Sequence, residues 1–170
     1  MDEPTTGPAP SAPSPPPRSQ RVFLVVVDQS PELKVALRFA CRRARATGGR
    51  VAMLYVTEPA SAEWLCVGDL MREEARTEAE TKLQELAAGV REMSGEVPVL
   101  YVREGAPRDE LIKLLDEEPT ISVLVLASDP GPKGPGPLIS ALAGKQVGKL
   151  RVPITIVPGS LSDPEIDAIT

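Results

Sequence analysis

The chain has 170 residues, of which 42% are hydrophobic, so it is long enough to bury one ordinary core. Its net charge of −5 argues against a nucleic-acid-binding surface, and no segment is long and apolar enough to be expected to span a membrane. The absence of histidine excludes hydrolases that depend on a Ser–His or Cys–His pair and removes the commonest metal ligand. We therefore expect no metal site.

The first twenty residues hold seven of the nineteen prolines, separated by Ser, Thr and Ala. This composition predicts a disordered, partly polyproline tail over residues 1–20, and the stretch has no apolar region typical of a secretory signal. It serves either as a solubilising tail or as a docking peptide for a PxxP reader, since Pro10 to Pro13 has that spacing.

The two cysteines, Cys41 and Cys66, have no metal-ligand spacing and indicate thiols of a reducing compartment, so we expect a cytoplasmic protein.

The run Val22–Val27 predicts a first strand that is buried on both faces, because it is apolar throughout. Ser30 and Pro31 suit the cap and first position of a helix whose apolar spacing extends to Ala44. Three arginines at positions 42, 43 and 45 are expected in its last turn, where they complement the helix dipole. A second strand is predicted over Val51–Val56.

A long helix is predicted over roughly residues 63–92, with an inward stripe from Met71 to Val90 and a solvated acidic face. A third strand, Val97–Val102, and a third helix around residues 107–115 follow. The run Ile121–Ala127 predicts a fourth strand. After ten residues in which Gly and Pro almost alternate, a short helix leads to a fifth strand, Val152–Val157.

Five strands that alternate with four helices predict a three-layer α/β domain with a parallel sheet. We expect this domain to occupy residues 21–159, followed by a short acidic C-terminal tail over residues 160–170. Ligands of open parallel sheets lie beyond the carboxyl ends of the strands. The glycine-rich loop after the fourth strand is therefore a candidate binding loop.

The segments VFLVVVDQSPELKVALRFA, GGRVAMLYVTEP, REGAPRDELIKLL and VPITIVPG resemble, in order and spacing, those of the universal stress protein family over residues 21–159. The resemblance implies a sheet of strand order 3-2-1-4-5 and a homodimer paired through the last strand, here Val152–Val157. It also implies a stress-response role, and the lack of histidine and of a nucleophile–base pair leads us to expect no enzyme activity. Members of one branch bind ATP, through a Gly-x-x-Gly, nine residues, then Gly-Ser or Gly-Thr.

This glycine pattern can be placed on the chain in two registers. In the literal register it falls on Gly131, Gly134 and Gly144, with Lys145 in place of the hydroxyl residue. Alignment from the flanking strands instead places the glycines on Ala127, Pro130 and Ser140, and the hydroxyl on Ala141. We prefer the second register because strands on both sides fix it. It predicts a degraded phosphate loop, since proline residues in the loop lack the N–H donors that bind phosphate.

The resemblance places the adenosine end of a nucleotide against Val27, Asp28 and Val56. Asp28 has an alternative role, which is to accept N–H groups of its own turn. Lys133 could meet a phosphate as a point charge, with Gly131 and Gly134 allowing close approach. The predicted nucleotide-binding residues are thus Val27, Asp28, Val56, Ala127, Gly131, Lys133, Gly134 and Ser140.

Three functions remain open from the sequence. The chain is a module that binds ATP or AMP, a nucleotide-free dimeric interaction protein of the same fold, or a slow ATPase. The last is disfavoured because no nucleophile–base pair or magnesium site is recognisable.

Overall fold

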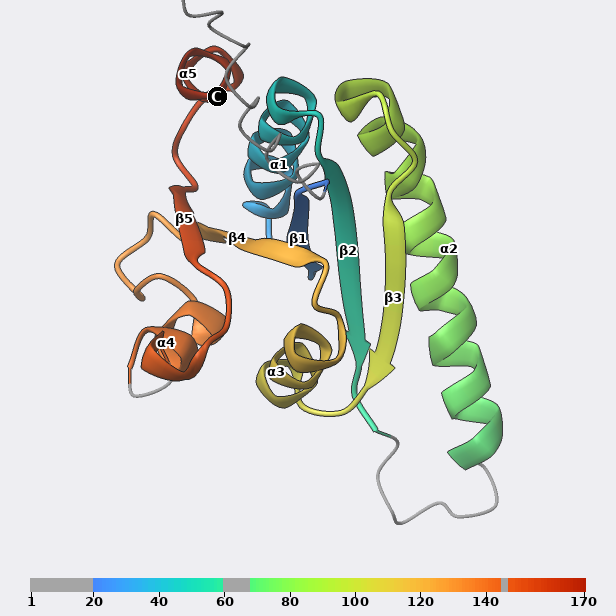
Figure 1. The fold of residues 1–170 in the computed structure, drawn as a ribbon. Coiled ribbons are helices and arrows are strands. Elements are labelled where there is room, and N and C mark those ends of the chain that lie inside the picture. The colour runs from blue at the N-terminus through green and yellow to red at the C-terminus, as the bar shows by residue number, and fades with distance from the viewer. Residues whose placement is uncertain (1–19, 60–67, 145–146) are drawn as a thin grey trace, which may run out of the picture.

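A computed structural model describes residues 20–59, 68–144 and 147–170 and shows one parallel sheet between two layers of helices (Figure 1). The sheet has the order β3-β2-β1-β4-β5, and every neighbouring pair is parallel, which confirms the predicted sheet and strand order. The predicted tail over residues 1–20 lies almost wholly outside the described residues, and Cys66 lies outside them. The strands are β1 (Val22–Val27), β2 (Arg50–Thr57), β3 (Val99–Glu104), β4 (Ile121–Ser128) and β5 (Ile154–Pro158).

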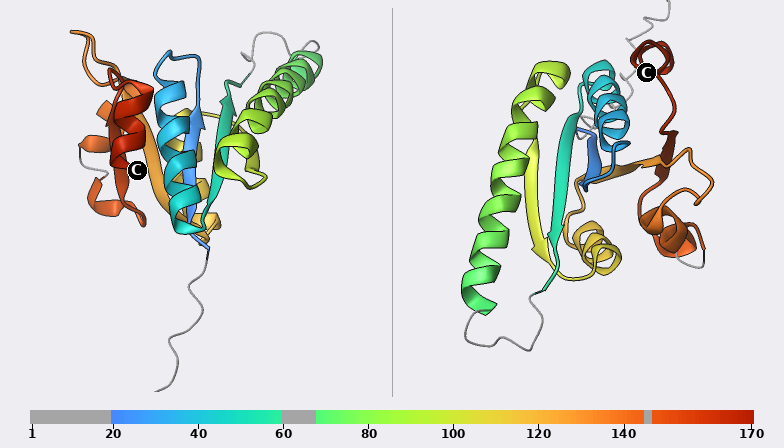
Figure 2. Two further views of the ribbon diagram at one scale, coloured as in Figure 1. Left: turned by 90° about the horizontal axis from the view of Figure 1, so that it is seen from above. Right: turned by 180° about the vertical axis from the view of Figure 1, so that it is seen from behind.

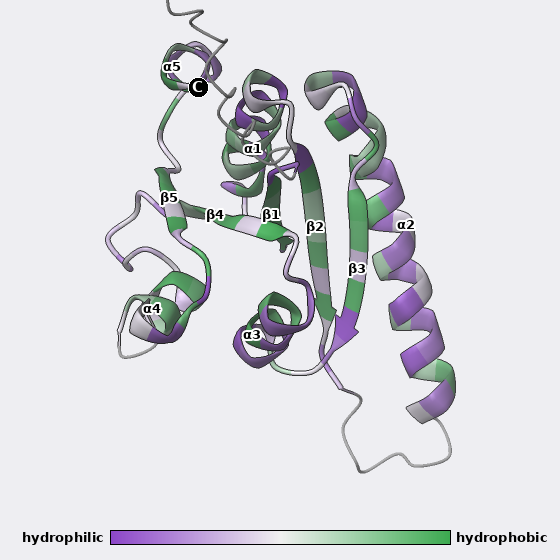
Figure 3. Cartoon of the chain, in the orientation of Figure 1, coloured by the Kyte–Doolittle hydropathy of each residue, from purple (hydrophilic) through white to green (hydrophobic). Residues whose placement is uncertain are grey.

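Helices cover both faces of the sheet, so the strands can be apolar throughout (Figures 2 and 3). Alternate residues of β1 divide between two cores: Val25 packs with one helical layer and Leu24 with the other. The first layer holds α1 (Leu33–Thr47) and α2 (Gly68–Ser94), and the second holds α3 (Pro107–Glu117) and α4 (Pro137–Ala143). A single 3₁₀ turn, Val147–Lys149, follows α4.

Three elements begin two residues later than predicted, each for a local reason. The first helix begins at Leu33 rather than at Pro31, because the hydroxyl and N–H of Ser30 both donate to the Asp28 carboxylate. The fifth strand begins after Pro153, which lacks an N–H for the ladder. Likewise the third strand begins after Pro98, at Val99.

The inward stripe predicted for the long helix is correct at Ala79, Leu83 and Val90, which are buried, but wrong at Met71, which is 50% exposed. The beginning predicted at Glu63 lies outside the described residues. Figure 1 gives the reason for the exposure: the first turns of α2 extend past the carboxyl ends of β2 and β3, where no sheet lies beneath them.

The prediction of four helices was wrong, because the described part of the chain has five. The additional helix, α5 (Asp163–Ile169), lies in the segment predicted to be a polar tail. Ile166 is fully buried, and the helix lies beside α1 on the same face of the sheet (Figure 2). The Glu165 carboxylate accepts hydrogen bonds from the N–H and hydroxyl of Ser162 at 2.8 Å, which fixes the first turn and lowers the pKa of Glu165.

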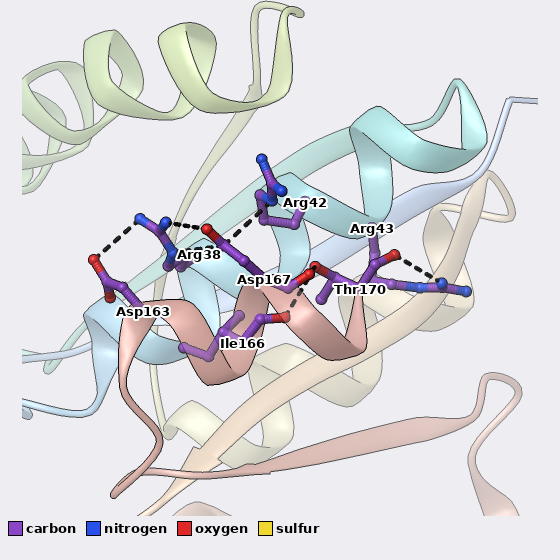
Figure 4. Close-up of polar contacts among 7 residues, drawn as sticks. All are labelled: Arg38, Arg42, Arg43, Asp163, Ile166, Asp167 and Thr170. Atoms are coloured by element: carbon purple, nitrogen blue, oxygen red, sulfur yellow. Dashed lines mark hydrogen bonds and ion pairs between the residues drawn. The ribbon is translucent and has the colours of Figure 1, made fainter.

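Arginines of α1 hold α5 in place (Figure 4). Arg38 pairs with Asp163 at 3.1 Å and Asp167 at 2.6 Å, and its hydrogen bond lowers the pKa of Asp167. Arg42 lies 3.3 Å from the same Asp167 carboxylate. Of the three arginines predicted to lie in the last turn of this helix, only Arg45 does so.

Cys41 lies inside the core between α1 and α2. Its side chain is fully buried, and its thiol lies 3.9 Å from the carbonyl oxygen of Val90. Burial raises the pKa of the Cys41 thiol to about 12.

Candidate functional site

A cavity of about 800 Å³ lies at the carboxyl ends of β1 and β2. This is where a parallel sheet commonly holds a ligand, because the loops after the strands diverge there. The overhanging first turns of α2 form one wall, and the N-terminal turns of α3 and α4 form others. The lining residues are Val26, Val27, Asp28, Gln29, Tyr55, Val56, Thr57, Glu58, Ala75, Glu78, Ala106, Pro107, Arg108, Asp109, Pro137, Leu138 and Ala141.

Three of the predicted site residues, Val27, Asp28 and Val56, line this cavity together. One Asp28 oxygen, Oδ1, accepts the Ser30 N–H at 2.9 Å and the Ser30 hydroxyl at 2.7 Å. Asp28 therefore forms the turn that was its alternative role, and it also lines the cavity. Lys82 donates to the carbonyl oxygen of Asp28 at 3.4 Å and lies 5.6 Å from the centre of the Tyr55 ring, so α2 holds this turn in place.

A second cavity, of about 390 Å³, adjoins the first. Both are lined by Asp28 and Leu138, so these two side chains lie where the cavities meet. Ala127, the fourth predicted site residue, lines the second cavity only, together with Asp129 and Gly136.

The remaining predicted residues, Gly131, Lys133, Gly134 and Ser140, line neither cavity. The Gly131 N–H donates to the Asp129 carboxylate at 2.7 Å, so this donor is already engaged within its own turn. Gly134 has φ of 96°, a conformation that favours glycine, and its N–H lies 3.4 Å from the Gly131 carbonyl oxygen. The glycines thus shape the loop.

The two registers place the hydroxyl position differently with respect to the main cavity. In the strand-aligned register that position is Ala141, which lines the main cavity from α4. In the literal register it follows Gly144, which caps the far end of α4. The strand-aligned register is therefore the one that brings the expected hydroxyl position to the cavity.

Several cavity residues escaped the sequence analysis, among them four charged ones. Glu58 follows β2 directly, as Asp28 follows β1, and this shared position at a strand's carboxyl end was the available signal. Arg108 and Asp109 lie in the first turn of α3, after a Gly-Ala-Pro turn that the sequence does show. Glu78 lines the cavity from α2, and no local pattern in the sequence indicates this.

Within the described ranges, no group of three or more His, Cys, Asp and Glu side chains is placed to hold a metal ion. None of the described helices is long and apolar enough to cross a membrane.

A parallel sheet covered by helices on both faces, with a cavity beyond its central strands, defines the doubly wound class of α/β fold. The model of the universal stress protein family matches residues 20–158, and the chain belongs to this family. No curated protein sequence matches it.

Solved structures of the family have the same fold. The universal stress protein UspA from Lactobacillus plantarum aligns with a TM-score of 0.68 at 18% identity, over 83% of this chain and 99% of that one. A family protein from Burkholderia pseudomallei aligns with a TM-score of 0.62 at 19% identity, over 84% of this chain and 99% of that one. The universal stress protein from Archaeoglobus fulgidus, solved in complex with dAMP, aligns with a TM-score of 0.55 at 22% identity. The alignment covers 82% of this chain and 98% of that one.

Proposed function

We propose that this protein is a cytoplasmic, non-enzymatic binding module for adenine nucleotides or nucleosides that acts in stress response. The observation that carries the proposal is the cavity of about 800 Å³ at the carboxyl ends of β1 and β2, with Val27, Asp28 and Val56 on its wall. Its size lies within the range of small-molecule sites. A family relative from Archaeoglobus fulgidus was solved with dAMP, an adenine nucleotide.

The wall has the composition that an adenosine moiety requires. Val26, Val56 and Leu138 offer apolar surface for a base, while Asp28 and Thr57 supply polar atoms near it. The phosphate end has fewer partners, because Gly131 already donates to Asp129 and the prolines at positions 130, 132, 135 and 137 have no N–H. ATP, AMP and adenosine are therefore the ligands to compare.

Filling the cavity should abolish binding. We expect the Ala141→Phe variant to bind AMP and adenosine at least about tenfold more weakly in calorimetry, because the added ring occupies space that the ligand needs. Ala143→Phe is the matched control: Ala143 is on the same helix but exposed and outside the cavity, so it should change affinity less than about twofold.

Circular dichroism of both variants checks that α4 is still folded. Failure of the unmodified protein to bind any of the three ligands at millimolar concentration would contradict the proposed function. Equal losses in the two phenylalanine variants would place the ligand elsewhere.

A dimeric interaction protein is the second candidate, and the outer edge of the sheet favours it. β5 is the last strand of the sheet, and an unpaired strand edge invites pairing with another copy. Ile156 on this strand is 45% exposed, and it lines an apolar groove of about 450 Å³ with Ile139, Leu142 and Leu150. We propose a homodimer through the predicted run Val152–Val157, within which the strand begins at Ile154.

Light scattering at micromolar concentration should give the mass of a dimer. The Ile156→Asp variant should shift the mass to that of a monomer, because it places a charge in an apolar contact. Ile169→Asp is the control, since Ile169 is also exposed but lies on α5. A monomeric unmodified protein would exclude this assembly.

A further inference from the structure

The main cavity is unusually acidic for a site that would receive phosphate. Four carboxylates line it, from Asp28, Glu58, Glu78 and Asp109, and they come from four different elements or their ends. Among the described lining residues, Arg108 is the only basic one. The excess of negative charge therefore surrounds the cavity rather than lying on one wall.

The single arginine is already engaged. Its Nε and Nη2 atoms donate to the same oxygen of Asp109, at 2.9 and 2.8 Å. An arginine bound in this way offers a phosphate less charge and fewer donors than a free guanidinium does. Asp109 therefore both adds a negative charge to the wall and holds the group that would otherwise attract an anion.

The loop after β4 does not compensate for the negative charge of the cavity wall. Gly131 donates to Asp129, whose carboxylate adds a negative charge at the adjoining cavity. α4 has only seven residues and begins with Pro137, which has no N–H, so its N-terminus offers little to an anion. A phosphate chain would meet carboxylates on one side and proline rings on the other.

The same wall suits an uncharged ligand with hydrogen-bond donors. Carboxylate oxygens only accept hydrogen bonds, and they match the hydroxyl groups of a ribose and the amino group of a base. The apolar surface of Val26, Val56 and Leu138 accommodates a flat ring beside them.

We propose that the cavity selects an uncharged nucleoside over its phosphates, and that Asp109 determines this selectivity. This inference rests on the proposed function and names the ligand class of the same cavity. Repulsion between the wall and the phosphates makes adenosine bind at least about tenfold more tightly than ATP.

Calorimetry with adenosine and ATP on the full chain tests the inference. The Asp109→Asn variant removes a negative charge and releases Arg108, so the ratio of ATP affinity to adenosine affinity should rise at least about three- to tenfold. Asp116→Asn is the matched control, because Asp116 is an exposed carboxylate of the same helix outside the cavity. It should leave both affinities unchanged.

Salt provides a second measurement that needs no variant. Because like charges repel, added salt should strengthen ATP binding and leave adenosine binding unchanged. Tighter binding of ATP than of adenosine, or ATP binding that weakens with salt, would overturn the inference and leave the proposed function standing. Binding of neither ligand would overturn both. A ratio of ATP affinity to adenosine affinity that is unchanged in Asp109→Asn would remove this residue as the determinant.

Discussion

We expect a variant with four substitutions to bind ATP about two to four decades more tightly than the unmodified protein. The substitutions are Ala127→Gly, Pro130→Gly, Ser140→Gly and Ala141→Ser. These changes restore the glycine pattern in the strand-aligned register. Pro130→Gly returns a backbone N–H, and Ala141→Ser adds a hydroxyl at the cavity wall. Each donor to a charged phosphate contributes about 1.5–3 kcal/mol, and about 1.4 kcal/mol corresponds to one decade.

The alternative register provides the matched control. Lys145→Ser completes the literal pattern with Gly131, Gly134 and Gly144, and we expect it to change ATP affinity little, because Gly144 lies at the C-terminal end of α4. Calorimetry on both variants decides between the registers. A large gain in Lys145→Ser alone, or submicromolar ATP affinity of the unmodified protein that is lost in Lys133→Ala, would show that the literal register is the correct one.

Replacing Gly159 by alanine should destabilise the fold by about 1–3 kcal/mol or more. A Cβ atom built on Gly159 would lie 2.3 Å from the carbonyl oxygen of Ser128 and 2.5 Å from Cγ of Glu32. The Ser128 carbonyl cannot move freely, since it accepts the Gly159 N–H at 2.9 Å and belongs to the end of β4. Relief therefore requires the end of β5 to shift, and α5 follows directly after it.

Urea denaturation measures this effect, and Gly89 provides the control. Gly89 lies within α2, where an added Cβ atom would meet nothing within 4 Å, so Gly89→Ala should stabilise the protein by about 0.5–1 kcal/mol. Equal stabilities of Gly159→Ala and the unmodified protein would mean that the segment between β5 and α5 adapts without cost.

The sheet could be predicted well from the sequence because its signal is local. Apolar runs such as Val22–Val27, each followed by turn residues, indicate doubly covered parallel strands, and the strand order followed from the family resemblance. α5 was missed although Ser162 and Glu165 have the spacing of a helix start. Its stability depends on burial of Ile166 against α1, a contact between segments far apart in the chain.

The site was predictable only at its centre. Val27, Asp28 and Val56 were named from the family resemblance, and all three line the main cavity, as the common edge at which parallel strands end leads one to expect. Glu78 and Asp109 could not be placed in this way, because their position depends on how α2 packs beside the strands and on where α3 begins. The charge of the cavity, on which the proposed ligand class depends, is therefore a property that only the assembled fold reveals.

The burial of Cys41 makes the rate at which its thiol is alkylated a measure of how often the core opens. Thiol reagents react with the thiolate, and both the closed core and a pKa of about 12 suppress that species. Alkylation of Cys41 at neutral pH therefore proceeds only in molecules whose α1 and α2 have separated. A ligand that binds only the closed form should slow this alkylation by the factor by which it stabilises that form, so the rate at Cys41 would report binding without any label on the ligand.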